Sequence, residues 1–221
     1  MKKSAKYIIF LNNRYRKDDF DFYLKRLRGR VTVAADGGIR FFIKTNRHPD
    51  ILIGDFDSSP KMSRRYLSQF EVITHPADKD KTDSQLAVEL ALERGALDIE
   101  LCGALSTDEI DHTLGNIFLL DLVNQFRRIN VKTVTARIVN PNESIYLIEN
   151  DKIDLTASPG DFLSIIPVID NSRVSFSGLV FPPPNHPLRF GDSLSLRNRF
   201  AGRRARLNVA GKVIVIINYK K

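Results

Sequence analysis

The stretch ILIGDFDSSP, residues 51–60, places two carboxylates directly after an apolar run. Residues 51–53 are typical of a buried strand, and Pro60 predicts the first turn of a following helix. Asp55 and Asp57 therefore fall between a strand end and a helix start, and in an extended backbone their side chains point to the same side. Two like charges on one side repel each other, so something must compensate them. A divalent metal, a lysine and solvent are the three candidates.

The same alternation of apolar runs and helical patterns fills the first 130 or so residues. Strands are predicted at 6–13, 31–38, 50–58, 71–76 and 98–105, and helices at 19–29, 39–46, 60–70, 81–95 and 111–128. Thr82 followed three residues later by Gln85 has the form of a capping box. Such an alternation predicts a parallel sheet with helices on its faces.

Short β-like runs without an intervening helix make up the rest of the chain. They are 131–139, 143–149, 151–157, 162–169, 173–181, 194–198, 205–210 and 212–218, with turn signals between them. We therefore predict an α/β N-terminal domain with a mainly parallel, Rossmann-like sheet at residues 1–135. A C-terminal all-β sandwich domain is predicted at residues 136–221.

Composition narrows the class of protein further. With 43% hydrophobic and 27% charged residues, the chain has the make-up of a soluble globular protein. No apolar stretch approaches the roughly 18 residues of a membrane span. Cys102 is the only cysteine, which excludes an intrachain disulfide and favours a cytoplasmic location.

The net charge of +8 is concentrated in residues 189–221, which carry nine Lys or Arg against Asp192 alone. These cations alternate with apolar residues, a pattern that disfavours nucleic acid and favours a small anionic substrate or a solvated sheet face.

Acidic residues and glycines follow four consecutive predicted strands: Asp36; Asp55 and Asp57; Asp78, Asp80 and Asp83; and Asp108, Glu109 and Asp111. For any single one of these acids, a role in a turn or in capping a helix is an alternative explanation. Because ligands of parallel sheets bind beyond the carboxyl ends of the strands, the four together predict a functional cleft. Carboxylates suit Mg²⁺ shared with substrate phosphates, which Lys79 and Lys81 would help to neutralise. No P-loop, GxGxxG or zinc-ligand spacing is present.

Four motifs in order resemble the thiamine pyrophosphokinase family: ADGG at 35–38, PDILIGDFDS at 49–58, DKDKTDSQLAVELA at 78–91 and DHTLGNIFLL at 111–120. The likeness continues through NPNESIYLIE, FLSIIPV, SFSGLVFP and GKVIVI, so it covers nearly the whole chain. The resemblance implies a homodimer that transfers pyrophosphate from ATP to thiamine with Mg²⁺, giving thiamine diphosphate and AMP.

The resemblance also implies roles for particular residues. The metal and phosphate centre would be Asp55, Asp57 and Asp83, with Asp36 and Asp111 as further acids of the cleft. The nucleotide side would hold Lys79, Thr82, His112 and Asn116. Thiamine would lie near the dimer interface, against the β domain, where Arg197, Asn198 and Phe200 are the substrate-binding candidates.

Two departures from the family pattern keep alternatives open. The family usually has G-G-R-x-D-H where this chain has STDEIDH, so Glu109 or its neighbour replaces an arginine. The family's Ser-Asn-Glu is here Arg197-Asn198-Arg199. The alternatives are a catalytically altered nucleotide-binding homologue, or a kinase acting on a related or phosphorylated acceptor. A haloacid dehalogenase-type phosphatase also has Asp-x-Asp, but after its first strand rather than its third.

Overall fold

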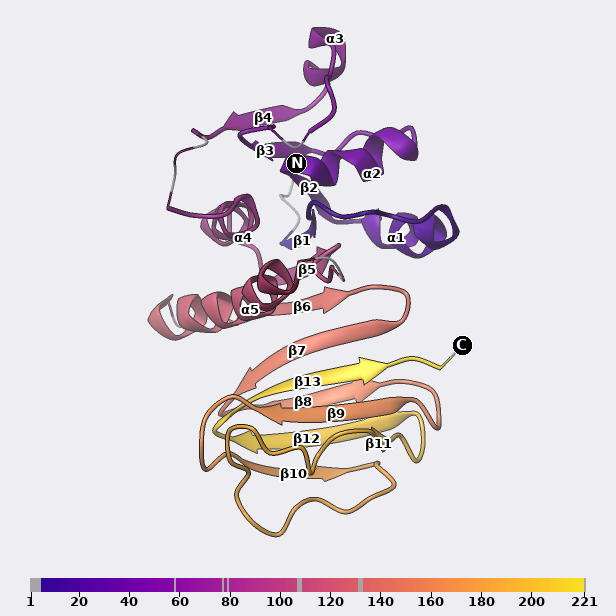
Figure 1. The fold of residues 1–221 in the computed structure, drawn as a ribbon, viewed down its shortest axis with the longest axis vertical. Coiled ribbons are helices and arrows are strands. Elements are labelled where there is room, and N and C mark those ends of the chain that lie inside the picture. The colour runs from indigo at the N-terminus through magenta and orange to yellow at the C-terminus, as the bar shows by residue number, and fades with distance from the viewer. Residues whose placement is uncertain are drawn as a thin grey trace. The chain divides into compact units, whose positions relative to one another are not determined.

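The computed structural model describes residues 5–57, 59–76, 78, 80–106, 109–130 and 133–220 (Figure 1). The chain divides into two compact units, Met1–Asn140 and Pro141–Lys221. The first is α/β with a parallel sheet and the second is all-β, which confirms the predicted fold class. Within the described residues, no helix is long and apolar enough to cross a membrane.

The first unit is built on a parallel sheet with strand order β6-β5-β1-β2-β3-β4. The strands are β1 (Lys6–Phe10), β2 (Val31–Ala35), β3 (Ile51–Gly54), β4 (Glu71–Thr74), β5 (Asp98–Cys102) and β6 (Thr135–Val139). Strand β1 pairs with both β2 and β5, so the order of strands reverses at β1. Open α/β sheets bind ligands at such a reversal, beyond the carboxyl ends of the strands.

Helices cover both faces of this sheet (Figure 1). They are η1 (Lys17–Asp19), α1 (Phe20–Leu27), η2 (Asp36–Gly38), α2 (Ile39–Lys44), α3 (Arg64–Leu67), α4 (Asp83–Glu93) and α5 (Ile110–Asn130). Helices α1 and α2 lie on one face, where Tyr23 and Phe41 pack around Phe10. Helices α4 and α5 lie on the other face.

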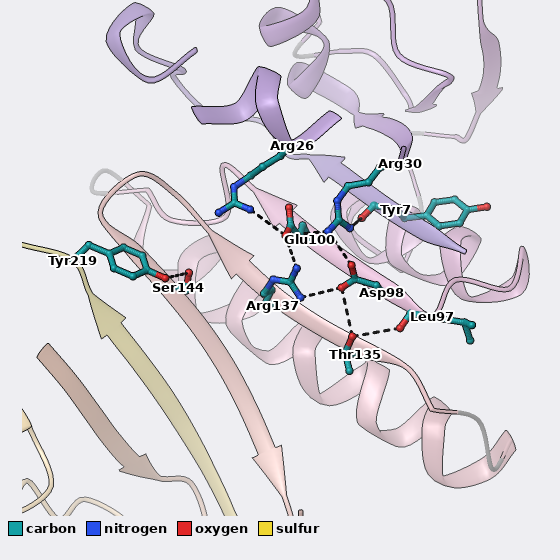
Figure 2. Close-up of polar contacts among 10 residues, drawn as sticks. All are labelled: Tyr7, Arg26, Arg30, Leu97, Asp98, Glu100, Thr135, Arg137, Ser144 and Tyr219. Atoms are coloured by element: carbon teal, nitrogen blue, oxygen red, sulfur yellow. Dashed lines mark hydrogen bonds and ion pairs between the residues drawn. The ribbon is translucent and has the colours of Figure 1, made fainter. Parts of the chain in front are cut away.

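A buried ionic network joins β5 to its neighbours in the first unit (Figure 2). Glu100 is fully buried, and its Oε1 atom lies 3.3 Å from Arg26, 3.2 Å from Arg30 and 2.5 Å from Arg137. Asp98 contacts two of these arginines again, at 2.8 and 2.9 Å. The network ties β6 and the end of α1 to β5.

The second unit is a sandwich of two antiparallel sheets. One sheet has the order β11-β9-β13-β7, from β7 (Glu143–Glu149), β9 (Phe162–Pro167), β11 (Asn198–Arg199) and β13 (Lys212–Asn218). The other has the order β10-β12-β8, from β8 (Lys152–Thr156), β10 (Arg173–Ser177) and β12 (Arg204–Ala210). Side chains such as Leu163, Leu207 and Val215 form the core from both sheets. The hydroxyl groups of Ser144 and Tyr219 form a hydrogen bond, with 2.8 Å between the two oxygens (Figure 2).

Three local predictions were wrong, and each has a physical reason. The run 131–139 was grouped with the β-rich half, but β6 pairs in parallel with β5; a short apolar run does not reveal which sheet it joins. The helix predicted from Pro60 is only Arg64–Leu67, because Ser63 provides the N-terminal cap by accepting a hydrogen bond from the Tyr66 amide. The run 194–198 forms only the two-residue strand β11.

Candidate active site

A pocket of about 490 Å³ opens at the carboxyl ends of the strands of the first unit. Its described walls come from the residues after all five of the strands β1 to β5 and from the starts of α4 and α5. The lining residues include Asn12, Asp36, Asp55, Asp57, Asp80, Lys81, Thr82, Asp83, Ser84, Ser106, Glu109, His112 and Asn116. The strand ends that the sequence singled out for their acids thus surround one cavity.

The turn after β2 lies directly against the end of β1. A side chain on Gly38 would place its Cβ 1.9 Å from the carbonyl oxygen of Phe10, and one on Gly37 would meet the Asn12 side chain at 2.1 Å. Arg40 donates a hydrogen bond to the Asn12 carboxamide oxygen at 2.6 Å. This close approach fixes Asp36, which is 6% exposed and has a positive φ of 44°, at the pocket wall.

Asp55 and Asp57 follow β3 and come together with Asp36. One carboxylate oxygen from each of the three lies within 4.8 Å of the others. The sequence predicts an extended backbone here, but the backbone of Phe56 has a left-handed conformation, with φ of 67°. The pair is held instead by a turn in which the Asp57 amide donates to Asp55 Oδ1 at 3.2 Å.

The start of α4 supplies the next wall of the pocket. Thr82 caps the helix by accepting a hydrogen bond from the Gln85 amide at 3.2 Å, as the sequence predicts. Asp83 is the first helical residue, and its buried Oδ1 atom lies against Gly54, 3.2 Å from where a Cβ would stand. The amides of the first helical turn carry partial positive charge, which favours phosphate at this wall.

Lys81 is held to the same helix by Glu89, with a distance of 2.9 Å between Nζ and Oε2. Burial alone would raise the pKa of Glu89, but hydrogen bonds from Lys81 and Gln85 outweigh it and lower the pKa below its usual value. The ammonium group is therefore paired with a carboxylate that stays ionised near neutral pH.

The described residues between β5 and α5 line the pocket and are fixed by side chains from elsewhere. Asn13 donates to the carbonyls of Gly103 and Leu105 at 2.9 and 2.7 Å. Asn116 donates to the Ala104 carbonyl at 3.0 Å. Cys102 at the end of β5 is buried, and burial raises the pKa of its thiol well above the usual value, so it is a core residue rather than a nucleophile.

Several predicted site residues line this pocket and others do not. Those in its wall are Asp36, Asp55, Asp57, Thr82, Asp83, His112 and Asn116. Asp111 is exposed at the start of α5, where it accepts a hydrogen bond from the His112 amide, and it is not among the described lining residues. Lys79 lies outside the described residues.

The substrate candidates of the second unit have distinct environments. Phe200 is 1% exposed and belongs to the sandwich core. Asn198 is also buried, and its side chain exchanges two hydrogen bonds of 3.0 Å with the backbone of Phe181. Arg197 is exposed and stacks over the ring of Phe162.

The chemistry of the first-unit pocket fits a divalent cation. Six described lining residues are acids, and Lys81 is the one lysine or arginine among them. Carboxylate oxygens are the hard ligands that Mg²⁺ prefers, and three of them already converge within 4.8 Å. The trio that converges includes Asp36, whereas Asp83 lies in the wall beside it.

Two polar residues escaped the sequence argument. Asn12 follows β1, a strand end that carries no acid. Ser59 donates a hydrogen bond to Asp36 Oδ1 at 3.1 Å. A search of every strand end for any polar side chain would have found Asn12, but nothing in the sequence places Ser59 beside Asp36.

The fold and the site define a two-part protein, with an acidic strand-end pocket in an α/β unit followed by a β sandwich. Residues 27–133 match the family model described as thiamin pyrophosphokinase, catalytic domain. A protein of Bacillus subtilis (strain 168) named thiamine pyrophosphokinase is 26% identical over 190 residues, which cover 84% of this chain and 85% of that protein.

Solved structures show the same fold. The crystal structure of thiamine pyrophosphokinase from Bacillus subtilis superimposes with a TM-score of 0.82 at 23% identity, covering 98% of this chain and all of that one. Thiamin pyrophosphokinase from Candida albicans gives 0.80 at 16% identity, with coverage of 97% and 89%. The chain belongs to the thiamine pyrophosphokinase family.

Proposed function

We propose that the protein transfers the pyrophosphoryl group of ATP to the hydroxyethyl group of thiamine. The alcohol oxygen bonds to the β-phosphorus of ATP while the bond from that phosphorus to the oxygen of the α-phosphate breaks. The products are thiamine diphosphate, AMP and the proton of the alcohol. The observation that carries the proposal is the convergence of Asp36, Asp55 and Asp57 in the strand-end pocket of a chain from this family.

The residues of the pocket suit phosphate transfer in separate ways. The N-terminus of α4 faces the cavity through Thr82, Asp83 and Ser84, where its amides favour phosphate oxygens. Lys81 adds a positive charge, and the Asn116 side chain fixes the loop after β5. Catalysis of this kind depends on holding the reacting groups in line and on stabilising the charge that develops.

Magnesium is the metal that the donor set suits. We propose Asp55, Asp57 and Asp83 as its candidate ligands, with Asp36 added because its oxygen converges with the first two. When bound, the ion supplies positive charge that neutralises the phosphate oxygens of ATP. The three carboxylates repel one another without a cation, so their convergence itself favours cation binding.

The two halves of the chain receive different roles in this proposal. The first unit, which includes β6 and ends at Asn140, is the catalytic, nucleotide-binding domain, and the second unit is the thiamine-binding and dimerisation domain. Arg197 and Asn198 remain substrate-binding candidates, while the burial of Phe200 in the sandwich core gives it a supporting role. We propose a homodimer, which light scattering on the purified protein checks directly.

A second candidate function is nucleotide binding without normal turnover, or transfer to a related or phosphorylated acceptor. The excess of acids over bases among the described lining residues, with Glu109 in the wall, favours it because a negatively charged wall repels a polyphosphate. This candidate predicts ATP binding without formation of thiamine diphosphate.

The test is a product assay. The purified protein is incubated with thiamine, ATP and Mg²⁺, and thiamine diphosphate, AMP, ADP and inorganic phosphate are separated by chromatography. Equal amounts of thiamine diphosphate and AMP support the proposal. Release of phosphate with ADP indicates a phosphatase, and ATP binding without either product indicates the altered homologue.

A further inference from the structure

Three positively charged side chains gather at the β11–β9 edge of the second unit. Arg197, Arg199 and Lys220 are all exposed, and within the described part of the chain none of them forms an ion pair. Elsewhere in the same unit an exposed arginine does find a carboxylate, since Arg206 contacts Asp154 at 2.6 Å. The charge at this edge is therefore not offset in the same way. We call these three residues the edge cations.

Two aromatic rings contact the edge cations: Phe162 contacts Arg197 and Lys220, and the centre of the Phe181 ring lies 5.8 Å from the guanidinium carbon of Arg199. The guanidinium carbon of Arg197 lies 4.1 Å from the centre of the Phe162 ring, and Nζ of Lys220 lies 5.2 Å from the same centre. The negative face of an aromatic ring attracts cations, which offsets part of their mutual repulsion. Arg199 stands directly across from Phe162 in the β11–β9 ladder, so its side chain leaves the same face of the sheet.

The backbone that carries the edge cations is fixed in an unfavourable conformation. Arg197 has a positive φ of 59°, which costs free energy for a residue with a Cβ. Its amide donates to Ser164 Oγ at 3.0 Å, which holds the turn against β9. The neighbouring Asn198 side chain accepts hydrogen bonds from the amides of Phe181 and Arg199, at 3.0 and 2.8 Å. Backbone strain maintained in this way is concentrated at ligand-binding sites.

The acid that directly precedes Phe162 does not neutralise the group. Asp161 is 3% exposed, and its two oxygens accept hydrogen bonds from the backbone amides of Lys220 and Ser158, each at 2.8 Å. These amides occupy the carboxylate oxygens, so the side chains of the edge cations keep their outward donors. One buried negative charge beside three positive ones leaves an excess of positive charge.

We propose that the edge cations form a binding site for the phosphate group of a small ligand. Guanidinium groups present paired donors that match phosphate oxygens, and charge-assisted hydrogen bonds of this kind are strong. Three cations at one short sheet edge suit a compact anion better than an extended polymer, which needs a long basic stripe. The site shares Arg197 with the substrate-binding candidates, so the proposal deepens the proposed function. Because binding of a phosphate there requires no turnover, the two proposals are tested separately.

The test compares two triple variants that lose the same charge. Arg197→Gln/Arg199→Gln/Lys220→Gln removes the edge cations. Arg173→Gln/Arg203→Gln/Arg204→Gln removes three exposed arginines elsewhere in the second unit and serves as the matched control. Binding of inorganic pyrophosphate is measured by calorimetry with EDTA present, which suppresses metal-dependent binding in the acidic pocket. Thiamine, thiamine monophosphate and a short single-stranded oligonucleotide are the other probes.

Wild-type protein and the control should bind pyrophosphate, and the edge variant should bind it at least about tenfold more weakly. Tighter binding of thiamine monophosphate than of thiamine, lost in the edge variant, identifies a phosphate on an organic ligand as the source; equal binding of those two identifies free phosphate. Absence of pyrophosphate binding to wild-type protein overturns the proposal, as does an equal loss in both triple variants. Tighter binding of the oligonucleotide than of either small phosphate also overturns it. If the edge variant fails to fold, Arg199→Gln alone, at an exposed position, should still weaken binding by about threefold.

Discussion

Gly38 allows the turn after β2 to lie against β1, and this contact sets the position of Asp36. A Cβ at residue 38 would stand 1.9 Å from the carbonyl oxygen of Phe10, a backbone atom that cannot move aside cheaply. Position 115 in α5 is the opposite case, because nothing lies within 4 Å of a Cβ placed there. Substitution of Gly38 therefore tests close packing, whereas substitution of Gly115 tests helix propensity alone.

Gly38→Ala should lower the free energy of unfolding by about 1–3 kcal/mol, since the turn must shift to relieve the overlap. Gly115→Ala should raise it by about 0.5–1 kcal/mol, because alanine is the better helix former and meets no obstacle. Urea denaturation of both variants measures the difference. A neutral Gly38→Ala would show that the close approach between β1 and the turn is not essential.

Asp57→Asn should reduce turnover at least about 100-fold while leaving the unfolding temperature nearly unchanged. The amide keeps the size of the side chain but removes a charge from the group that converges with Asp36 and Asp55. Calorimetric titration with Mg²⁺ should show weaker binding independently of activity. Asp18→Asn, at an exposed position outside the pocket, is the control. Normal turnover in Asp57→Asn would refute the assignment of this residue to the centre.

At the scale of elements, β5 carries a buried charge network and leads into residues that line the pocket. Glu100 is fully buried among three arginines whose side chains are 11% to 33% exposed (Figure 2). Removing one partner of a buried ionic network destabilises the fold by more than the whole network stabilises it, because the remaining buried charges lose their compensation. Strand β5 is therefore sensitive to a change of charge at residue 100.

Glu100→Gln should lower the free energy of unfolding on the order of 3 kcal/mol, since three arginines lose their shared carboxylate. Glu71→Gln provides the matched comparison, because Glu71 pairs with Arg94 at 2.6 Å near the surface. That exposed pair should contribute less than about 1 kcal/mol. Denaturant titration of the two variants checks the ranking, and equal losses would contradict it.

Glu89→Gln should have a pH-dependent effect on stability. The pKa of Glu89 is lowered in the folded protein from its ordinary value of 4.5, so the ionised form stabilises the fold above that value. The contribution disappears as the pH falls through the lowered pKa. The difference in free energy of unfolding between wild type and variant should thus be small but measurable at pH 7, under about 1 kcal/mol, and should disappear as the pH falls below the lowered pKa of Glu89. A difference that grows in acid would contradict this assignment.

The sequence predicted the fold class and the start of α4 correctly, but it misplaced the helix start at Pro60. The capping role of Thr82 follows from two residue types at a fixed spacing, and the structure confirms it. The turn between Asp55 and Asp57 could not be predicted, because Phe56 is not a residue type that favours a positive φ. The pairing of β6 with β5 also escaped prediction, since it depends on contacts between distant parts of the chain.

At the scale of the whole molecule, charge is divided between two sites of opposite sign. The first unit presents an acidic pocket whose described walls include six carboxylates, and the second presents the edge cations on its β11–β9 edge. Sequence composition indicated the second of these, because the basic residues are concentrated after residue 189. It could not indicate which cations lack an acidic partner, since pairing such as Arg206 with Asp154 depends on strand register.

If an intact pyrophosphoryl group moves from ATP to thiamine, the β-phosphorus of ATP must end in thiamine diphosphate. ATP labelled at the β-phosphorus is incubated with the protein, thiamine and Mg²⁺, and the labelled product is identified by chromatography. We expect the label to enter thiamine diphosphate while unlabelled AMP appears in equal amount. Label retained in ADP, or in ATP that is bound but never consumed, would contradict it.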